Sequence, residues 1–113
     1  MSIEPAVCDA AEANGILEPG NRWPGPQHEN PNWRTFSIET EDNGEPDRER
    51  VTDAQYATTL YICRLILAIW PGVKYLMGHY VISPRSRTCP AARWRASRRL
   101  AELAEDAGLE LRL

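Results

Sequence analysis

The chain has 113 residues, of which 42% are hydrophobic and 26% are charged, and its formal net charge is −3. This length allows one small domain, and the composition is typical of a globular protein rather than a disordered chain. The longest apolar run, LYICRLILAIW, is too short to span a membrane and contains Arg64.

The charges are unevenly distributed along the chain. Residues 39–53 contain seven acids and two arginines, whereas residues 85–99 contain six arginines and no acid. Two solvated faces of opposite sign account for this pattern, and an interaction surface remains the alternative.

The cysteines and the first residues bear on the cellular compartment. Three cysteines without tight spacing argue against a disulfide framework. The first residues, MSIEPAVCDAAEANG, lack the basic start and apolar core of a signal peptide. We therefore expect a chain made soluble in the cytosol, which reaches any other compartment only if something else releases it.

The first third of the chain predicts little regular structure. Residues 4–17 are compatible with a short helix, and residues 19–31 are rich in proline and glycine, which predicts a loop. Trp23 and Trp33 are expected to pack on a core. We describe residues 1–29 as an N-terminal irregular or weakly helical segment that precedes a domain at residues 30–113.

The next segment, RTFSIETE, predicts a strand with one buried face. Phe36 and Ile38 alternate with the polar Ser37, Glu39 and Glu41. A turn at DNGEPD follows this strand.

The segment 51–70 predicts a long helix. Thr52 and Gln55 have capping-box spacing, and Pro71 with Gly72 ends the helix. Apolar residues occur nearly all round it, which predicts a buried helix. Cys63 lies within this helix and is expected to be a core residue, because a buried free cysteine behaves as a small hydrophobe.

The last segments predict a strand and a helix. VKYLMGH is expected to be a short strand that ends at His79, and residues 91–113 a second helix with Gly108 as its C-cap. Trp94, Leu100 and Leu103 should face inward. The predicted fold is therefore α/β: a small mixed sheet packed by a long buried helix and a C-terminal helix.

His79 and Cys89 bracket a loop that contains Pro84, and Pro90 directly follows Cys89. Imidazole and thiolate are both good zinc ligands. A single His–Cys pair at this spacing is weak evidence for a metal site, and the spacing alone favours a loop histidine and a free thiol.

Several motifs occur in a fixed order along residues 30 to about 95. They are Ser37-Ile38-Glu39, Thr52-Asp53-Ala54-Gln55, Gly78-His79, Ser83-Pro84 and Cys89-Pro90. In this order the chain resembles the zinc-dependent N-acetylmuramoyl-L-alanine amidases, the family of amidase-type phage endolysins and peptidoglycan recognition proteins. The resemblance implies the C-terminal part of that family's fold.

The resemblance also implies roles for individual residues. His79 and Cys89 would be the second and third zinc ligands, and Glu39 the carboxylate that assists the attacking water. Arg87 would stabilise the developing oxyanion, where many members have a lysine. Glu41, on the same strand face, is the alternative to Glu39.

For two further residues, a purely structural role is also considered. Arg87 is equally compatible with a surface charge, and Tyr80 is expected to pack in the loop.

The chain departs from the family at the first zinc ligand, a histidine that members carry on an early strand. We expect no such strand here. His28, in the loop GPQHENPNW, corresponds better to a cleft residue that is not a ligand. Three explanations stay open: a truncated copy of a larger amidase, His28 or Cys8 as a substitute ligand, or a groove that binds peptidoglycan without cutting it.

The expected function is therefore zinc-dependent hydrolysis of the bond between the muramoyl lactyl group and L-alanine in peptidoglycan. The alternative is a non-catalytic peptidoglycan-binding module. A third reading takes RSRTCPAARWRASRR as a nucleic-acid surface. The negative net charge and the absence of a nucleic-acid motif argue against it. We expect Zn²⁺ as cofactor, peptidoglycan as partner, and neither nucleic acid nor membrane; the oligomeric state stays open.

Overall fold

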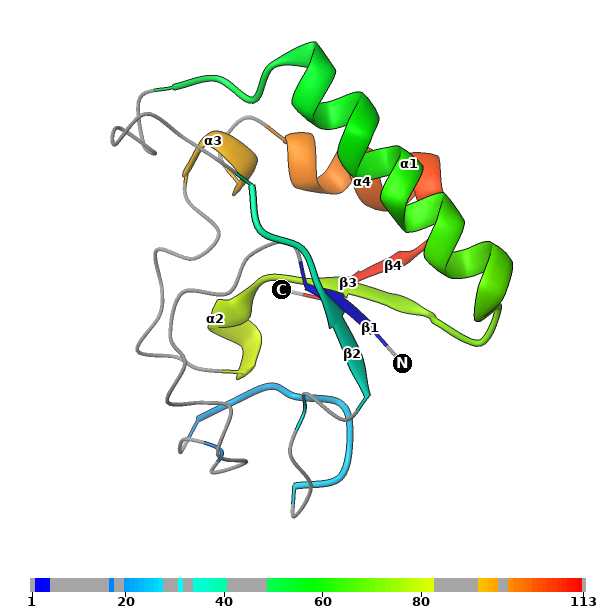
Figure 1. Ribbon diagram of the computed structural model, residues 1–113. Helices are drawn as coiled ribbons and strands as arrows, with labels where there is room; N and C mark the ends of the chain where they lie inside the picture. The colour runs from blue at the N-terminus through cyan, green and yellow to red at the C-terminus, as the bar shows by residue number, and fades with distance from the viewer. Residues whose placement is uncertain are drawn as a thin grey trace.

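The computed structural model describes residues 2–4, 17, 20–27, 31, 34–40, 49–82, 92–95 and 98–112. Its centre is a four-stranded sheet with the order β2-β1-β3-β4, as Figure 1 shows. The strands are β1 (Ser2–Glu4), β2 (Thr35–Ser37), β3 (Tyr75–Met77) and β4 (Glu110–Arg112). All described pairings are parallel, so the prediction of an α/β fold is confirmed, whereas the prediction of a mixed sheet is wrong for these strands.

The described helices are α1 (Asp53–Ile69), α2 (His79–Ile82), α3 (Ala92–Arg95) and α4 (Arg99–Ala107). The connection from β1 to β2 crosses the sheet in one direction, and the connections from β2 to β3 and from β3 to β4 cross it in the other. Crossover connections between parallel strands are right-handed, so connections that run in opposite directions lie on opposite faces of the sheet. The β1–β2 connection therefore lies on one face, and the β2–β3 and β3–β4 connections lie on the other. In Figure 1, α1 and α4 lie over one face, while α2 and residues 20–27 lie toward the other.

The core has two parts because β3 is buried on both faces. Successive side chains of a strand point to opposite faces, and Leu76 and Met77 are both fully buried. Leu76 packs in the larger cluster, with Cys63, Ile66, Trp94, Leu100 and Leu103 among its members. Met77 packs in a smaller cluster with Trp23, Tyr80, Val81 and Ile82. The predicted burial of Trp23, Cys63, Trp94, Leu100 and Leu103 is confirmed.

Helix α1 begins as the sequence predicts. The Thr52 hydroxyl accepts a hydrogen bond from the Gln55 backbone N–H at 3.0 Å, and the Gln55 side chain accepts one from the Thr52 backbone N–H at 3.3 Å. This reciprocal capping box satisfies two donors that a helix start leaves without partners. The helix ends at Ile69, directly before the turn at Pro71 and Gly72.

The prediction that this helix is buried all round is wrong. Tyr61, Leu65, Ile69 and Trp70 are exposed, and Tyr61 and Ile69 retain 62% and 63% of their surface. One stripe of α1 faces the sheet and α4, and no described element covers the other side. The sheet is too small to enclose a helix, so apolar residues beyond the inward stripe face solvent.

The C-terminal segment, predicted as one helix, contains two helices, α3 and α4, followed by strand β4. Arg98 adopts a left-handed conformation with φ 64°, which separates α3 from α4 because an L-residue disfavours that region within a helix. Gly108 is the predicted C-cap, with φ 72°, and its N–H bonds the carbonyls of Ala104 and Glu105. The helix therefore ends where predicted, and the chain then enters β4, a strand that was not predicted.

Strand predictions near the ends also need correction. Glu4 lies in β1 rather than in a helix, and Leu17 has no regular structure; the rest of segment 4–17 lies outside the described residues. Strand β1, which lies between β2 and β3, was not predicted, and it carries no histidine. Strand β3 ends at Met77, two residues earlier than predicted, and His79 instead begins α2.

The predicted strand at 34–41 is found in a shorter form, at Thr35–Ser37. Ile38 is buried, Ser37 and Glu39 are exposed, and Phe36 is half-buried with its ring 4.7 Å from that of Trp70. Trp33 and Glu41 lie outside the described residues. Among the helices that the structure describes, none is long and apolar enough to cross a membrane.

Candidate functional site

Two of the predicted site residues lie within the described structure. Glu39 is exposed and lies two residues beyond the end of β2, and His79 is buried, two residues beyond the end of β3. Arg87, Cys89 and His28 lie outside the described residues, as does Cys8.

Parallel strands end at the same edge of a sheet, and this places Glu39 and His79 at comparable positions. Ser37 pairs with Glu4, and Leu76 pairs with Ile3, so β2 and β3 end level with each other on either side of β1. Neighbouring strands lie about 4.8 Å apart, which puts β2 and β3 about 10 Å apart. The two residues therefore follow strand ends at one edge, with a single strand between them.

His79 occupies a fixed environment. It is 2% exposed, and the residues that follow it in α2 are buried as well. The Val81 N–H donates to the Gly78 carbonyl at 3.1 Å, which closes the turn around His79. An imidazole held in one orientation by its surroundings is suited to metal ligation or to proton transfer.

A buried polar network anchors the residue next to Glu39. The Thr40 hydroxyl accepts hydrogen bonds from the Arg93 guanidinium at 3.1 Å and from the Trp94 indole N–H at 3.0 Å. Arg93 is only 5% exposed and also donates to the Gln55 side chain at 3.2 Å. A buried guanidinium requires such acceptors, because its desolvation is costly.

This network connects three motifs that the sequence analysis treated separately. Thr40 follows Glu39, Gln55 closes the capping box of α1, and α3 comes shortly after Cys89 and Pro90. The sequence analysis did not predict Arg93 and Thr40 as partners. Their separation of 53 residues leaves no local signal in the sequence that could have predicted the pair.

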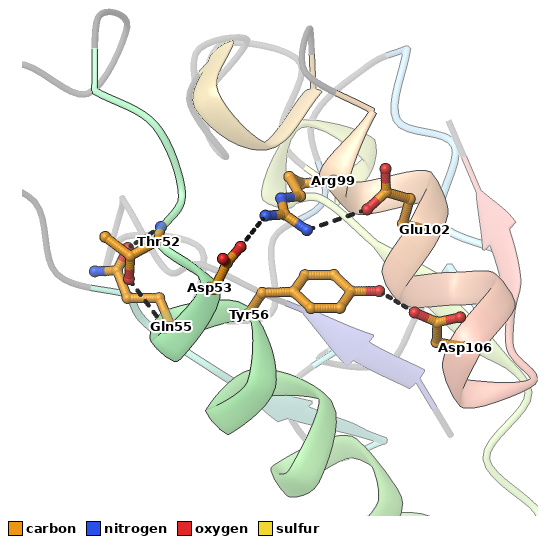
Figure 2. Close-up of polar contacts among 7 residues, drawn as sticks. All are labelled: Thr52, Asp53, Gln55, Tyr56, Arg99, Glu102 and Asp106. Carbon is orange, nitrogen blue, oxygen red and sulfur yellow. Dashed lines mark hydrogen bonds and ion pairs between the residues drawn. The ribbon is translucent and has the colours of Figure 1, made fainter.

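A second polar network joins α1 to α4 and is structural (Figure 2). Arg99 contacts Asp53 at 2.8 Å and Glu102 at 3.2 Å, and its guanidinium lies over the Tyr56 ring. The Tyr56 hydroxyl donates to the Asp106 carboxylate. Burial and that carboxylate both raise the pKa of Tyr56. This network engages one arginine of the basic segment 85–99, and Arg93 turns inward, so neither adds an open charge to a nucleic-acid surface.

Cys63 is separate from the candidate site. It is fully buried in α1, and burial raises the pKa of its thiol to about 11. The thiol is therefore protonated at neutral pH, and zinc binds the thiolate form. Within the described ranges, no three His, Cys, Asp or Glu side chains come together as a group that could hold a metal ion.

Comparison with known proteins gives no relative. No protein-family model, no curated protein and no solved structure matches this chain.

Proposed function

We propose that this chain is a zinc-dependent N-acetylmuramoyl-L-alanine amidase that acts on peptidoglycan, and that its α/β core corresponds to the C-terminal part of the amidase fold. The supporting observation is the common position of Glu39 and His79 beyond the ends of β2 and β3. Glu39 belongs to the Ser-Ile-Glu motif, and His79 belongs to the Gly-His motif. A carboxylate and an imidazole at one sheet edge suit hydrolysis.

The proposed ligand set is consistent with zinc in chemistry but incomplete in number. His79 supplies an imidazole and Cys89 would supply a thiolate, whereas zinc enzymes use three protein ligands. His28 or Cys8 is one possible source of a third ligand, and a site with only two protein ligands would hold zinc loosely. Zinc, when bound, lowers the pKa of its water toward about 7 and polarises the amide carbonyl.

Two side chains of the protein would perform the remaining catalytic steps, proton transfer and charge stabilisation. The Glu39 carboxylate would accept a proton from the attacking water and deliver it to the amine of L-alanine as the amide bond breaks. Its exposed position at the sheet edge leaves both oxygens accessible to substrate. The Arg87 guanidinium would stabilise the negative charge that develops on the carbonyl oxygen. Unlike lysine, it would not donate a proton, because its pKa is too high.

Two features support Glu39 in this role. Thr40 is held by Arg93 and Trp94, so the backbone beside Glu39 is fixed although the Glu39 side chain itself is exposed. The same hydrogen bonds connect it to α3, shortly after the proposed ligand Cys89. The network thereby holds α3, which follows Cys89 in the sequence, next to the residue that follows Glu39.

The experiment is a peptidoglycan assay with added zinc that detects newly exposed amino groups of L-alanine. We expect the wild-type chain to release them and Glu39→Gln to lower the rate at least about 100-fold, the usual contribution of a general base. Glu105→Gln, an exposed acid on α4, is the matched control and should retain full activity.

Two results would contradict this proposal. Full activity of Glu39→Gln would remove the catalytic role from that carboxylate. Sedimentation of the wild-type chain with cell walls, without any released amino groups, would instead favour the non-catalytic binding module.

A further inference from the structure

Two arginines share one aromatic ring at the sheet edge where β3 ends. The guanidinium carbon of Arg95 lies 4.4 Å from the centre of the Tyr80 ring, and that of Arg22 lies 5.8 Å from it. Because both distances are measured from the same centre, the guanidinium carbons are at most about 10 Å apart. Three separate segments supply these residues: the loop 20–27, α2 and the end of α3.

The ring that carries the arginines is fixed by the smaller core cluster. Tyr80 is 7% exposed and packs with Trp23 and Met77, among others. The Arg22 N–H donates to the Val81 carbonyl at 2.7 Å, which ties the loop 20–27 to α2. The guanidinium groups extend from this rigid base, and both arginine residues are exposed.

The hydrogen-bonding capacity of the cluster is not fully used. The Tyr80 hydroxyl is buried and makes no hydrogen bond to any described part of the chain, and the same holds for the Trp23 indole N–H. Buried polar groups normally have partners, and an exception calls for an explanation such as a ligand.

The sheet topology independently points to the same place. The connection that leaves β1 leads to β2, and the one that leaves β3 leads to β4, in the opposite direction. In open parallel sheets, ligands bind outside the carboxyl ends of two such neighbouring strands. Tyr80 is the third residue after the end of β3. In Figure 1, α2, α3 and residues 20–27 all lie toward this end of the sheet.

We propose that Arg22, Tyr80 and Arg95 form a binding site for a small oxyanion, a ligand that carries carboxylate or phosphate groups. Guanidinium groups bind both through paired, charge-assisted hydrogen bonds. A ligand with one or two anionic groups would bind at these guanidinium groups beside the Tyr80 ring. The site needs no zinc and is independent of the amidase proposal, although Tyr80 adjoins His79.

The test is a calorimetric titration of the full chain at low ionic strength with a metal chelator present. Inorganic phosphate and glutarate are the two probes, and they distinguish the phosphate source from the carboxylate source. We expect at least one of them to bind with a dissociation constant below about 10 mM. Arg22→Gln and Arg95→Gln should each weaken that binding at least about fivefold, the loss expected for a charge-assisted contact.

Arg64→Gln is the matched control. Arg64 is an exposed arginine on α1 whose guanidinium donates to the Asp106 carbonyl, away from Tyr80, and its loss should leave binding unchanged. Because Arg22 and Arg95 are exposed, their variants should stay folded and lose at most about 1 kcal/mol of stability with the cation–π contact to Tyr80. Absence of binding by both probes, or equal binding by wild type and both variants, would overturn the site.

Discussion

Gly25 packs against the indole of Trp23 so closely that no side chain fits. A Cβ added at Gly25 would lie 2.6 Å from three atoms of that ring, well inside van der Waals contact. Trp23 cannot move aside easily, because it is 6% exposed and belongs to the smaller core cluster. The loop 20–27 therefore depends on a glycine at this position.

We predict that Gly25→Ala lowers the free energy of unfolding by about 1–3 kcal/mol, the usual cost of overpacking. Gly72→Ala is the control: nothing lies within 4 Å of its added Cβ, and its φ is outside the left-handed region. That variant should change stability by less than about 0.5 kcal/mol or raise it slightly. Urea unfolding of the three proteins measures the difference, and equal stabilities would show that Trp23 does not occupy this position.

At the residue scale, the sequence predicts which side chains are buried better than it predicts which polar side chains form hydrogen bonds with each other. Periodic apolar spacing identified Leu100 and Leu103 as core residues, because burial of an apolar side chain requires only the correct helix face. The hydrogen bonds of Arg93 to Thr40 and Gln55 could not be predicted. Each joins residues far apart in the chain, and such pairings depend on how whole elements come together.

At the element scale, α1 has two sides of very different character. Ile66 and Ile69 are one turn apart, yet Ile66 is 9% exposed within the larger core cluster and Ile69 is 63% exposed. The two positions carry the same side chain on the same helix. Replacing each of them by alanine changes helix propensity equally, so any difference in stability between the two variants comes from burial.

We predict that Ile66→Ala lowers the free energy of unfolding by about 2–5 kcal/mol, as deletion of a buried side chain does. Ile69→Ala should cost less than about 1 kcal/mol, because its side chain already contacts solvent. Thermal or urea unfolding distinguishes the two. Similar losses for both variants would mean that a surface not described here covers the outer side of α1.

The short strands show where sequence reasoning fails for elements. β1 and β4 were missed although they are no shorter than β2 and β3, and although β4 lies in the alternating segment LELRL directly after a helix. Their parallel partners come from distant segments, so no hairpin turn signals the pairing. The capping box at Thr52 and the C-cap at Gly108 were predictable because both depend on local backbone hydrogen bonds.

At the scale of the whole molecule, the candidate site depends on the parallel arrangement of the sheet. A parallel sheet collects at one edge the residues that follow its strands, and here these include Glu39 and His79. The sequence motifs indicated both residues as functional candidates. Their common edge could not be derived from the sequence, because it requires β1 between β2 and β3.

The central claim is that His79 and Cys89 ligate zinc, and the zinc content of three purified proteins tests it most directly. We predict about one tightly bound zinc per wild-type chain, and at least about tenfold weaker binding by Cys89→Ser, because the thiolate is a principal ligand. Cys63→Ser should keep its zinc and lose stability, since that thiol is buried and protonated. A wild-type chain without zinc, or a Cys89→Ser variant that binds zinc equally well, would contradict the account.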